Sequence, residues 1–375
     1  MQHVMIAIGV AFFVVSIISV VNVLSYWSDG SDHFEILREE AHLGVFDPTF
    51  EFAHKDFGWM AYAAIFDDQT GRLPLVSVKT AMSSREGKTW KSYGVAFESK
   101  EDSILDPQKT GGEIQGVWRY EMPSLVYTPG DTGKEWKLYA YRYFWNGDIV
   151  LARQTGVIVY KYTPDPLRVP WSKEEWLFSA DEFNPPRPYN GLISLKLNTL
   201  HQSLKDIVAY ADPGAFFKDG ILYMTLSAFT SVEDPDRIIM IASNDFGQSW
   251  VYLGNLLTQK DLRSMENLTR YSAAQIIEKD GRPYVLVTFG DKVQKGVGSF
   301  VIPVTDLKKA KLERDENGTL NVIKHFPVGE DSFSALGGGQ SDYHKDSATG
   351  VMMSVMKSNR NNKAPFEITI QGHDF

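Results

Sequence analysis

The feature that most constrains the fold of this chain is a unit that recurs five times after residue 41. Each copy begins at a polar or acidic residue, continues into an apolar strand and a polar turn, and ends in an aromatic-rich strand. The units start at Asp47, Glu121, Asp212, Ser272 and Asp342, at spacings of 74, 91, 60 and 70 residues. A unit of this length has room for four short strands, which make up one β-propeller blade. The repeat predicts an all-β fold, a five-bladed β-propeller over residues 42–375.

Composition limits what such a domain can do and what holds it together. The chain has no Cys, which excludes disulfide bonds, thiolate zinc sites and cysteine nucleophiles. A formal net charge of −9 argues against a nucleic-acid partner, because phosphate binding needs a basic face. Aromatic residues make up 13% of the chain and recur in the second strand of each unit, so we expect most of them to pack between blades.

The N-terminal segment predicts a membrane anchor. Val4 to Leu24 is a 21-residue apolar run with no charged residue before Asp29, and as a helix it would span roughly 31 Å, the thickness of a bilayer core. Residues 1–27 are therefore predicted to be a signal anchor or, alternatively, a cleaved signal peptide, and residues 28–41 a linker. We expect the domain to be extracytoplasmic and attached to a membrane, or secreted or periplasmic after cleavage.

A second repeated element supports the propeller. The stretch from Ser243 to Trp250 (SNDFGQSW) fits the S-x-D-x-G-x-[ST]-W pattern of an Asp-box turn, and the stretch from Ser83 to Trp90 fits it except for the Asp. In such a turn the Asp accepts backbone hydrogen bonds, the Gly takes a positive φ and the Trp packs beneath. The spacing predicts that each turn lies between the third and fourth strands of its blade.

The acidic unit starts predict the catalytic residues. The innermost strands of a propeller converge on one axis, which brings Asp47, Glu121 and Asp212 to one pocket. Carboxyl groups that share a pocket push their pKa values apart, so that one remains an acid while another is a base. Glycosidic bond cleavage needs this combination. Taken singly, an Asp-Pro at a strand start also serves as a turn cap.

The unit starts also resemble those of the five-bladed glycoside hydrolases of the family 43 and family 32 superfamily. Asp47-Pro48 resembles the Asp-Pro of the first blade, whose Asp is the base or nucleophile, and Glu121-Met122-Pro123 resembles the Glu-x-Pro of the acid-bearing blade. Gly337 to Ser341 (GGGQS) resembles the Gly-x-Gly-His stretch near the central ion or water. The resemblance implies a carbohydrate ligand, with Glu121 as acid, Asp47 as base or nucleophile, and Asp212 as a residue that tunes pKa or orients the sugar.

Two departures from that pattern affect the expected chemistry. The family order of acidic residues is Asp, Asp, Glu, whereas this chain has Asp, Glu, Asp. Gln340 replaces the axial His, which puts a central Ca²⁺ in doubt. No cofactor and no metal-binding residue are predicted, because the eight His show no paired ligand spacing.

Substrate-binding residues are predicted beside the unit starts. The candidates are Arg119, Tyr120, Arg270, Tyr271, Gln340 and Asp342. An Arg at two blade starts can bind an acidic sugar through its guanidinium. The same arginines, with Arg187 as a third, leave open a sialidase-like reaction, in which a Tyr activated by Glu attacks the sugar.

Three functions therefore remain open. The first is a glycoside hydrolase-like protein that acts on a carbohydrate through the carboxyl trio. The second is a non-catalytic propeller that binds glycans or another surface partner. The third is a sialidase-like exo-glycosidase. The sequence leaves open whether the protein is an enzyme.

Overall fold

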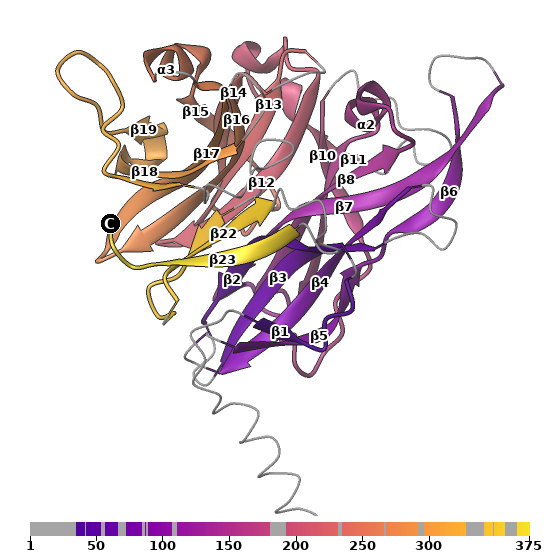
Figure 1. Ribbon diagram of the computed structural model, residues 1–375. Coiled ribbons are helices and arrows are strands. Elements are labelled where there is room, and N and C mark those ends of the chain that lie inside the picture. Colours follow the sequence, from indigo (N-terminus) through magenta and orange to yellow (C-terminus); the bar gives the residue numbers. More distant parts are fainter. Residues whose placement is uncertain are drawn as a thin grey trace, which may run out of the picture.

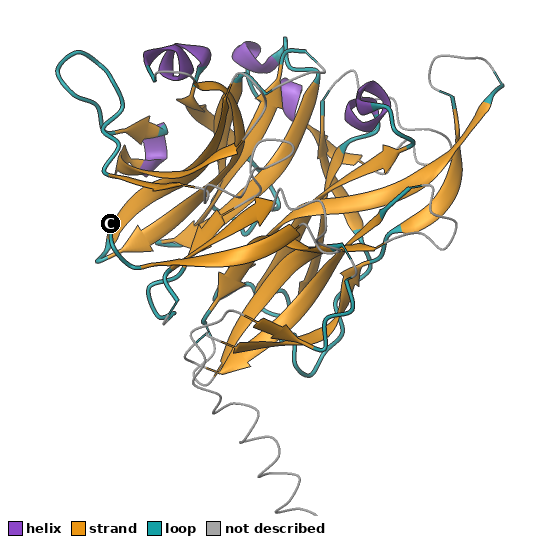
Figure 2. Cartoon of the chain, viewed as in Figure 1, coloured by secondary structure: helices purple, strands orange, loops and turns teal. Residues whose placement is uncertain are grey.

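The structure is a computed structural model. It describes residues 35–41, 43–53, 57–66, 73–84, 87, 89–106, 111–180, 193–231, 235–265, 268–291, 296–327, 341–347, 349–356 and 366–375. Strands make up most of this part of the chain, as predicted (Figure 2). The short helices are α2 (Ile149–Gln154), α3 (Gln259–Ser264), η1 (Leu197–Thr199), η2 (Gln202–Leu204) and η3 (Leu307–Lys309).

The first and fifth units share an eight-stranded sheet with the order β1, β5, β4, β3, β2, β23, β22, β21. Its first-unit strands are β1 (Glu35–Leu37), β2 (Gly44–Glu51), β3 (Phe57–Phe66), β4 (Leu75–Ser84) and β5 (Thr89–Phe97). Its fifth-unit strands are β21 (Ser341–Tyr343), β22 (Val351–Met356) and β23 (Phe366–Gly372). The two parts join where β23 pairs with β2 in parallel at Phe366 and Gly44. The fifth unit thus joins the first through the C-terminal strand.

The second, third and fourth units each form their own sheet (Figure 1). The second contains β6 (Lys100–Leu105), β7 (Glu113–Tyr127), β8 (Trp136–Trp145), β9 (Val157–Thr163), β10 (Glu175–Ser179) and β11 (Ile193–Lys196). The third contains β12 (Ala209–Lys218), β13 (Ile221–Phe229), β14 (Arg237–Ser243) and β15 (Val251–Leu257). The fourth contains β16 (Leu268–Lys279), β17 (Arg282–Asp291), β18 (Gly296–Asp306), β19 (Lys311–Leu312) and β20 (Lys324–Pro327).

One strand of every unit, its inner strand, contacts its counterparts in the two neighbouring units. β2 contacts β7, β7 contacts β12, β12 contacts β16, β16 contacts β21, and β21 contacts β2 again. These inner strands form a closed ring, from which the remaining strands of each unit extend outward. The arrangement is β-propeller-like.

The core consists of apolar layers between neighbouring units. β8 shows how one strand serves two layers: Tyr139 and Tyr141 pack against the third unit, whereas Leu138 and Ala140 pack against the first. Side chains of a strand alternate between its two faces, so a strand buried on both faces is apolar throughout. The layer formed by Phe50, Trp90, Met352 and Ile368 joins the fifth unit to the first. The aromatic residues are therefore mostly packing residues, as predicted.

Buried polar side chains link the inner strands around the ring. Thr49 Oγ1 accepts the Leu125 N–H at 3.1 Å, and Ser124 Oγ accepts the Ala215 N–H at 2.7 Å. Asp342 Oδ2 accepts the Phe50 N–H at 3.0 Å. In each pair, a side chain of one unit binds the backbone of the next.

The two remaining links differ in detail. The third unit has Gly214 at the hydroxyl position, and the Gln275 side chain donates instead to the Ala215 carbonyl at 2.8 Å. An added Cβ at Gly214 would lie 2.2 Å from the Ala274 carbonyl oxygen, so these two strands approach too closely for a side chain. Between the fourth and fifth units, Ser341 of the inner strand β21 bonds at 2.5 Å to Ser299 of β18, which is not an inner strand. The ring of buried bonds is thereby complete.

A β-bulge interrupts the inner strand of the first three units at equivalent positions. The bulged residues Asp47, Met122 and Asp212 have φ values of 53°, 50° and 54°, and a Pro follows each one. The residue before Pro normally avoids such a conformation, and positive φ is uncommon outside Gly, so the three bulges are strained. The structure corrects the alignment of the second unit by one residue, because Met122 and not Glu121 is the counterpart of Asp47.

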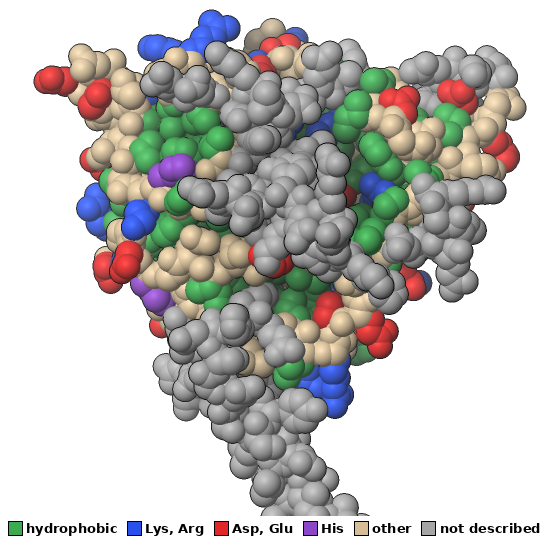
Figure 3. Space-filling view, viewed as in Figure 1, with side chains coloured by type: hydrophobic (Ala, Val, Ile, Leu, Met, Phe, Trp, Pro, Cys, Tyr) green, Lys and Arg blue, Asp and Glu red, His purple; other side chains and the backbone are tan. Residues whose placement is uncertain are grey.

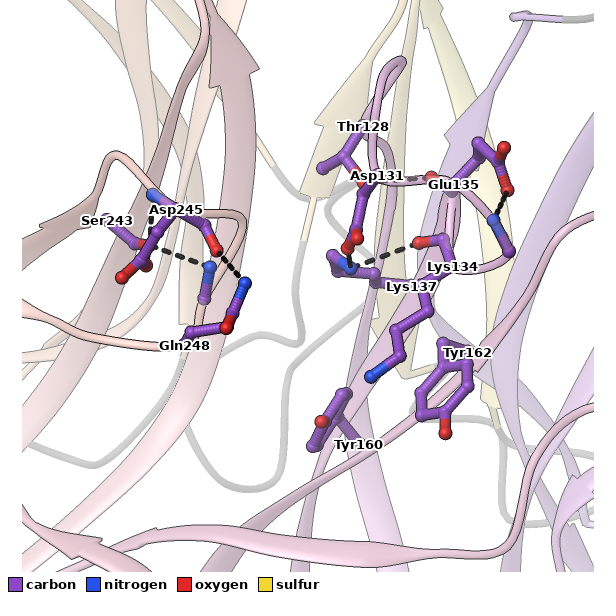
Figure 4. Close-up of polar contacts among 12 residues, drawn as sticks. Thr128, Asp131, Lys134, Glu135, Lys137, Tyr160, Tyr162, Ser243, Asp245 and Gln248 are labelled. Carbon is purple, nitrogen blue, oxygen red and sulfur yellow. Dashed lines mark hydrogen bonds and ion pairs between the residues drawn. The ribbon is translucent and has the colours of Figure 1, made fainter.

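The two predicted Asp-box segments lie between the third and fourth strands of their units. Asp245 lies between Ser243 and Gln248 in the third-unit turn (Figure 4), and its Oδ1 accepts the Ser249 N–H at 2.8 Å. Trp250 Nε1 donates to the Gly247 carbonyl at 3.0 Å. In the first unit, Trp90 Nε1 donates to the Gly87 carbonyl at 2.8 Å. Each Trp thus closes its turn against a Gly of positive φ.

The predicted N-terminal anchor, residues 1–27, lies outside the described residues. Within the described part of the chain, no helix is long and apolar enough to span a membrane. Part of the predicted linker is structured, because β1 pairs in parallel with β5. The Pro-rich segment 181–190 is also outside the described residues.

The ring of buried bonds predicts the stability of a single variant. Ser124→Ala leaves the buried Ala215 N–H without its acceptor, so we expect the free energy of unfolding to fall by about 1–3 kcal/mol. Urea unfolding followed by tryptophan fluorescence measures this change. Ser103→Ala, at an exposed serine, is the matched control and should change stability by less than about 0.5 kcal/mol. Equal stability of the two variants would contradict the importance of the ring.

Candidate active site

A cavity of about 620 Å³ opens among the second, third and fourth units. Its charged lining residues are Arg119 and Glu121 of β7, Arg153 of α2, Asp212 of β12 and Arg270 of β16. We call it the arginine cavity. Aromatic rings of β8, β13 and β16 complete much of the remaining wall: Tyr141, Tyr143, Trp145, Phe229 and Tyr271. A largely apolar and aromatic wall with a few convergent polar groups is typical of a small-molecule site.

The two carboxyl groups of the arginine cavity have different surroundings. Glu121 Oε1 accepts a hydrogen bond of 2.5 Å from the Tyr143 hydroxyl. Burial raises the pKa of Asp212 to about 6, the nearby Glu121 raises it further, and Arg153 and the Ser227 hydroxyl oppose this rise. Asp212 therefore keeps its proton to a higher pH than an ordinary Asp and is about half protonated near pH 6, whereas Glu121 accepts the tyrosine hydrogen bond.

The three arginines approach the cavity from separate elements. Arg119 is buried, its Nε donates to the Pro74 carbonyl at 2.9 Å, and its guanidinium lies 5.0 Å from the Trp145 ring centre. The Arg153 guanidinium lies 4.2 Å from the ring centre of Phe229. These contacts orient the planar groups through aromatic faces.

Two glycines make room for side chains of the cavity wall. A Cβ at Gly290 of β17 would lie 2.6 Å from Arg270 Nε and 2.9 Å from its Cγ. A Cβ at Gly156 would lie 2.3 Å from the Tyr141 hydroxyl. Real Cβ atoms do not approach other atoms so closely, so both glycines allow the wall side chains to lie flat against the sheet.

The structure brings five of the predicted site residues together in the arginine cavity: Arg119, Glu121, Asp212, Arg270 and Tyr271. Tyr120 instead lies in the layer between the first and second units, where its hydroxyl donates to Glu174 at 2.8 Å. It follows Arg119 directly in β7, so it points to the opposite face of the sheet. Gln340 lies outside the described residues.

Asp47 is fully buried beside the cavity and is not one of the described residues that line it. Its Oδ2 accepts the Met122 N–H at 3.1 Å, and its own N–H donates to Ser354 Oγ at 2.6 Å. The carboxylate therefore contacts the bulge that carries Glu121. The Asp47 carboxylate therefore contacts the backbone of the second unit and does not line the arginine cavity with Glu121 and Asp212.

Asp342 lies at the opposite end of the inner strands. It lines a second cavity of about 370 Å³, formed by residues that follow the bulges, such as Phe50 and Leu125. Burial raises the pKa of Asp342 to about 7, although hydrogen bonds from the N–H groups of Phe50 and Tyr343 and from Thr49 oppose the rise. Among the described residues, no group of three or more His, Asp or Glu side chains could hold a metal ion.

Several cavity residues were not predicted from the sequence, among them Tyr143 and Arg153. Tyr143 belongs to the second strand of its unit, whereas the prediction considered only strand starts. Arg153 lies in α2, and Asp148 caps that helix by accepting the Val150 N–H at 2.8 Å. An Asp after a Gly and before a short run without Pro is a helix-start signal that was available in the sequence.

Comparisons with known proteins support the fold. No family model matches the sequence, and no curated protein matches it either. A glycoside hydrolase of family 32 from Bifidobacterium adolescentis superimposes with a TM-score of 0.53 at 12% identity, over 92% of this chain and 57% of that chain. The chain thus matches somewhat more than half of that enzyme. The likeness confirms a β-propeller-like fold similar to that of the family 32 enzyme.

Two further solved structures are similar at lower scores. The GH43 endo-arabinanase from Bacillus licheniformis has a TM-score of 0.49 at 11% identity, covering 90% of this chain and 96% of that chain. The catalytic domain of a GH62 alpha-L-arabinofuranosidase from Coprinopsis cinerea has a TM-score of 0.47 at 12% identity, covering 90% and 93%.

The environment of Asp212 predicts how stability depends on pH. Its pKa of about 6 in the folded protein exceeds the ordinary value of about 3.9 in the unfolded chain. The folded state then binds the proton more tightly, so this group contributes stability at low pH that is lost as pH rises from about 4 to about 6. We expect Asp212→Asn to flatten this decline in urea-unfolding experiments across that range. An unchanged slope would show that Asp212 is not buried as described.

Proposed function

We propose that the chain is a five-bladed β-propeller glycoside hydrolase that cleaves a glycosidic bond in the arginine cavity. The observation that carries the proposal is the pair of carboxyl groups, Glu121 and Asp212, in one cavity with different surroundings. Such a pair can supply the acid and the base of glycoside cleavage. The β-propeller-like fold and the similarity to a family 32 enzyme support a carbohydrate ligand.

The surroundings assign the two roles. Asp212, with its raised pKa of about 6, is the general acid that donates a proton to the leaving oxygen. Glu121 either removes a proton from the attacking water or attacks the anomeric carbon itself. Tyr143 holds the Glu121 carboxylate in place through its 2.5 Å hydrogen bond. This assignment differs from the one that the family resemblance implied, in which Glu121 is the acid.

Asp47 has a positioning role in this proposal. Its bond to the Met122 N–H fixes the strained bulge from which Glu121 projects. A buried carboxylate that accepts a backbone N–H is costly to remove, so Asp47 supports the geometry of the site from outside the cavity.

A second candidate is a sialidase-like reaction. The specific observation that favours it is the Tyr143–Glu121 pair. Glu121 would remove the Tyr143 proton as the tyrosine oxygen attacks the sugar, and Asp212 would again protonate the leaving group. Tyr143→Phe separates the candidates: it should abolish turnover if Tyr143 is the nucleophile and reduce it about tenfold if Tyr143 only orients Glu121.

Substitution of the two carboxyl groups tests the proposal. We expect Glu121→Gln and Asp212→Asn each to lower turnover by about 10²–10⁴-fold on any responsive member of a panel of aryl glycosides and oligosaccharides. Glu113→Gln, at an exposed residue of the same strand, is the matched control and should leave turnover unchanged. If both cavity variants keep full turnover, the cavity is not the active site. If the unaltered protein binds glycans and cleaves none, the protein is the non-catalytic propeller.

The role of Asp212 also predicts the pH profile. Because the general acid must carry its proton, kcat/KM should fall as pH rises above about 6, the pKa of Asp212. Asp212→Asn should remove this limb and leave a low, flatter profile. Initial rates from pH 4 to pH 9 at low substrate concentration measure the effect. If kcat/KM of Asp212→Asn still falls above about pH 6, another group is the general acid.

We also propose that the domain lies outside the cytoplasm, because residues 4–24 form a long apolar run without charge. Membrane fractionation and protease protection of the full chain would test this. Release of the protein from membranes by high salt would argue against an inserted anchor.

A further inference from the structure

The arginine cavity carries more cationic than acidic side chains. Arg119, Arg153 and Arg270 line it together with the two carboxyl groups described above. The chain as a whole has the opposite balance, with 47 acidic and 38 basic residues. On the face shown in Figure 3, acidic and basic side chains are interspersed. A local excess of cations inside a cavity attracts an anionic ligand, because low-dielectric walls focus the field.

A buried arginine outside the cavity has a carboxylate of its own as a partner. Arg142 forms an ion pair with Glu174 at 3.6 Å, and its guanidinium lies 3.8 Å from the Trp118 ring centre and 4.4 Å from that of Trp176. By contrast, neither Arg119 nor Arg153 forms an ion pair with a carboxylate within the described part of the chain.

Asp212 compensates part of the charge of Arg153, which lowers the pKa of Asp212, but the cavity holds three arginines and only two carboxyl groups. Burial of a cation costs free energy unless a hydrogen-bonded counter-charge compensates it. Three guanidinium groups from β7, α2 and β16 converge on one cavity, so a single anionic group can contact more than one of them. The planar guanidinium matches the two oxygens of a carboxylate, to which it donates paired hydrogen bonds.

We propose that the arginine cavity recognises a glycan residue that carries a carboxylate, a uronic or ulosonic acid, through Arg119, Arg153 and Arg270. This inference rests on the proposed function for the location of the sugar, and it names the class of sugar. The aromatic rings of Tyr141, Trp145 and Phe229 contact the sugar ring, while the arginines bind its charged group. The substrate of the enzyme is then an acidic glycan.

Binding measurements on matched probes test the inference. Two acidic oligosaccharides, one ending in glucuronic acid and one in N-acetylneuraminic acid, are compared with their methyl esters by isothermal titration calorimetry. Esterification removes the charge and leaves the sugar ring unchanged. We expect at least one acid to bind about tenfold or more tightly than its ester, a preference that weakens with added salt. Equal affinity of acid and ester in both pairs would overturn the inference.

Variants identify the groups responsible. Arg153→Gln should reduce the preference for the acid to less than about threefold. Arg282→Gln makes the same change of charge at an exposed arginine and should keep the full preference. Gly290→Ala keeps every charge but displaces Arg270, so it should also weaken binding of the acid more than of the ester. It serves as the second variant if Arg153→Gln does not fold, as judged by circular dichroism. Retention of the full preference in both cavity variants would overturn the inference.

A failure of this inference can be distinguished from a failure of the proposed hydrolase function. An acid-specific ligand that binds and is not cleaved would support the charge recognition and contradict the hydrolase. Cleavage of neutral glycosides, with no preference for acids, would support the hydrolase and overturn the inference.

Discussion

The ring of buried hydrogen bonds between neighbouring units is the constraint on which the rest of the structure depends. Thr49, Ser124 and Asp342 each accept a backbone N–H of the next unit, and Gln275 and the Ser299–Ser341 pair complete the circuit. Apolar layers between sheets are non-directional and would allow neighbouring units to slide. A buried hydrogen bond has a fixed length and direction, and leaving it unmade is costly. These bonds therefore fix the register of the units, which in turn fixes where the side chains of β7, β12 and β16 meet.

The site depends on that register because its residues come from different units. The bulges at Asp47, Met122 and Asp212 place a strained residue at the same height in three inner strands. Strain of this kind persists only where the surrounding structure enforces it. Here the fixed strands, the prolines after each bulge and the Asp47–Met122 bond provide that enforcement. The outcome is one cavity in which Glu121, Asp212 and three arginines face each other.

The repeat allowed much of the fold to be predicted from the sequence, including the positions of the inner strands and of the Asp-box segments. It also brought Glu121 and Asp212 to one cavity. The prediction was wrong where the type of residue does not indicate its position in the strand or the face to which it points. The second unit was aligned on its acidic residue, although the strained position is Met122, whose side chain gives no signal. Tyr120 was grouped with Arg119, although adjacent strand residues face opposite sides. Arg153 and Tyr143 lie outside the repeated strand starts, so no repeat could reveal them.

The pairing of β23 with β2 has a consequence for the order of assembly. The first unit is synthesised before the fifth, but its inner strand β2 pairs with β23 of the fifth unit. Until β23 has been made, this edge of β2 lacks its partner strand, and the apolar surface of Phe50 lacks the cover that Met352 and Ile368 provide. Exposed strand edges recruit other chains. Closure of the ring through β23 therefore also removes an edge at which another chain could pair.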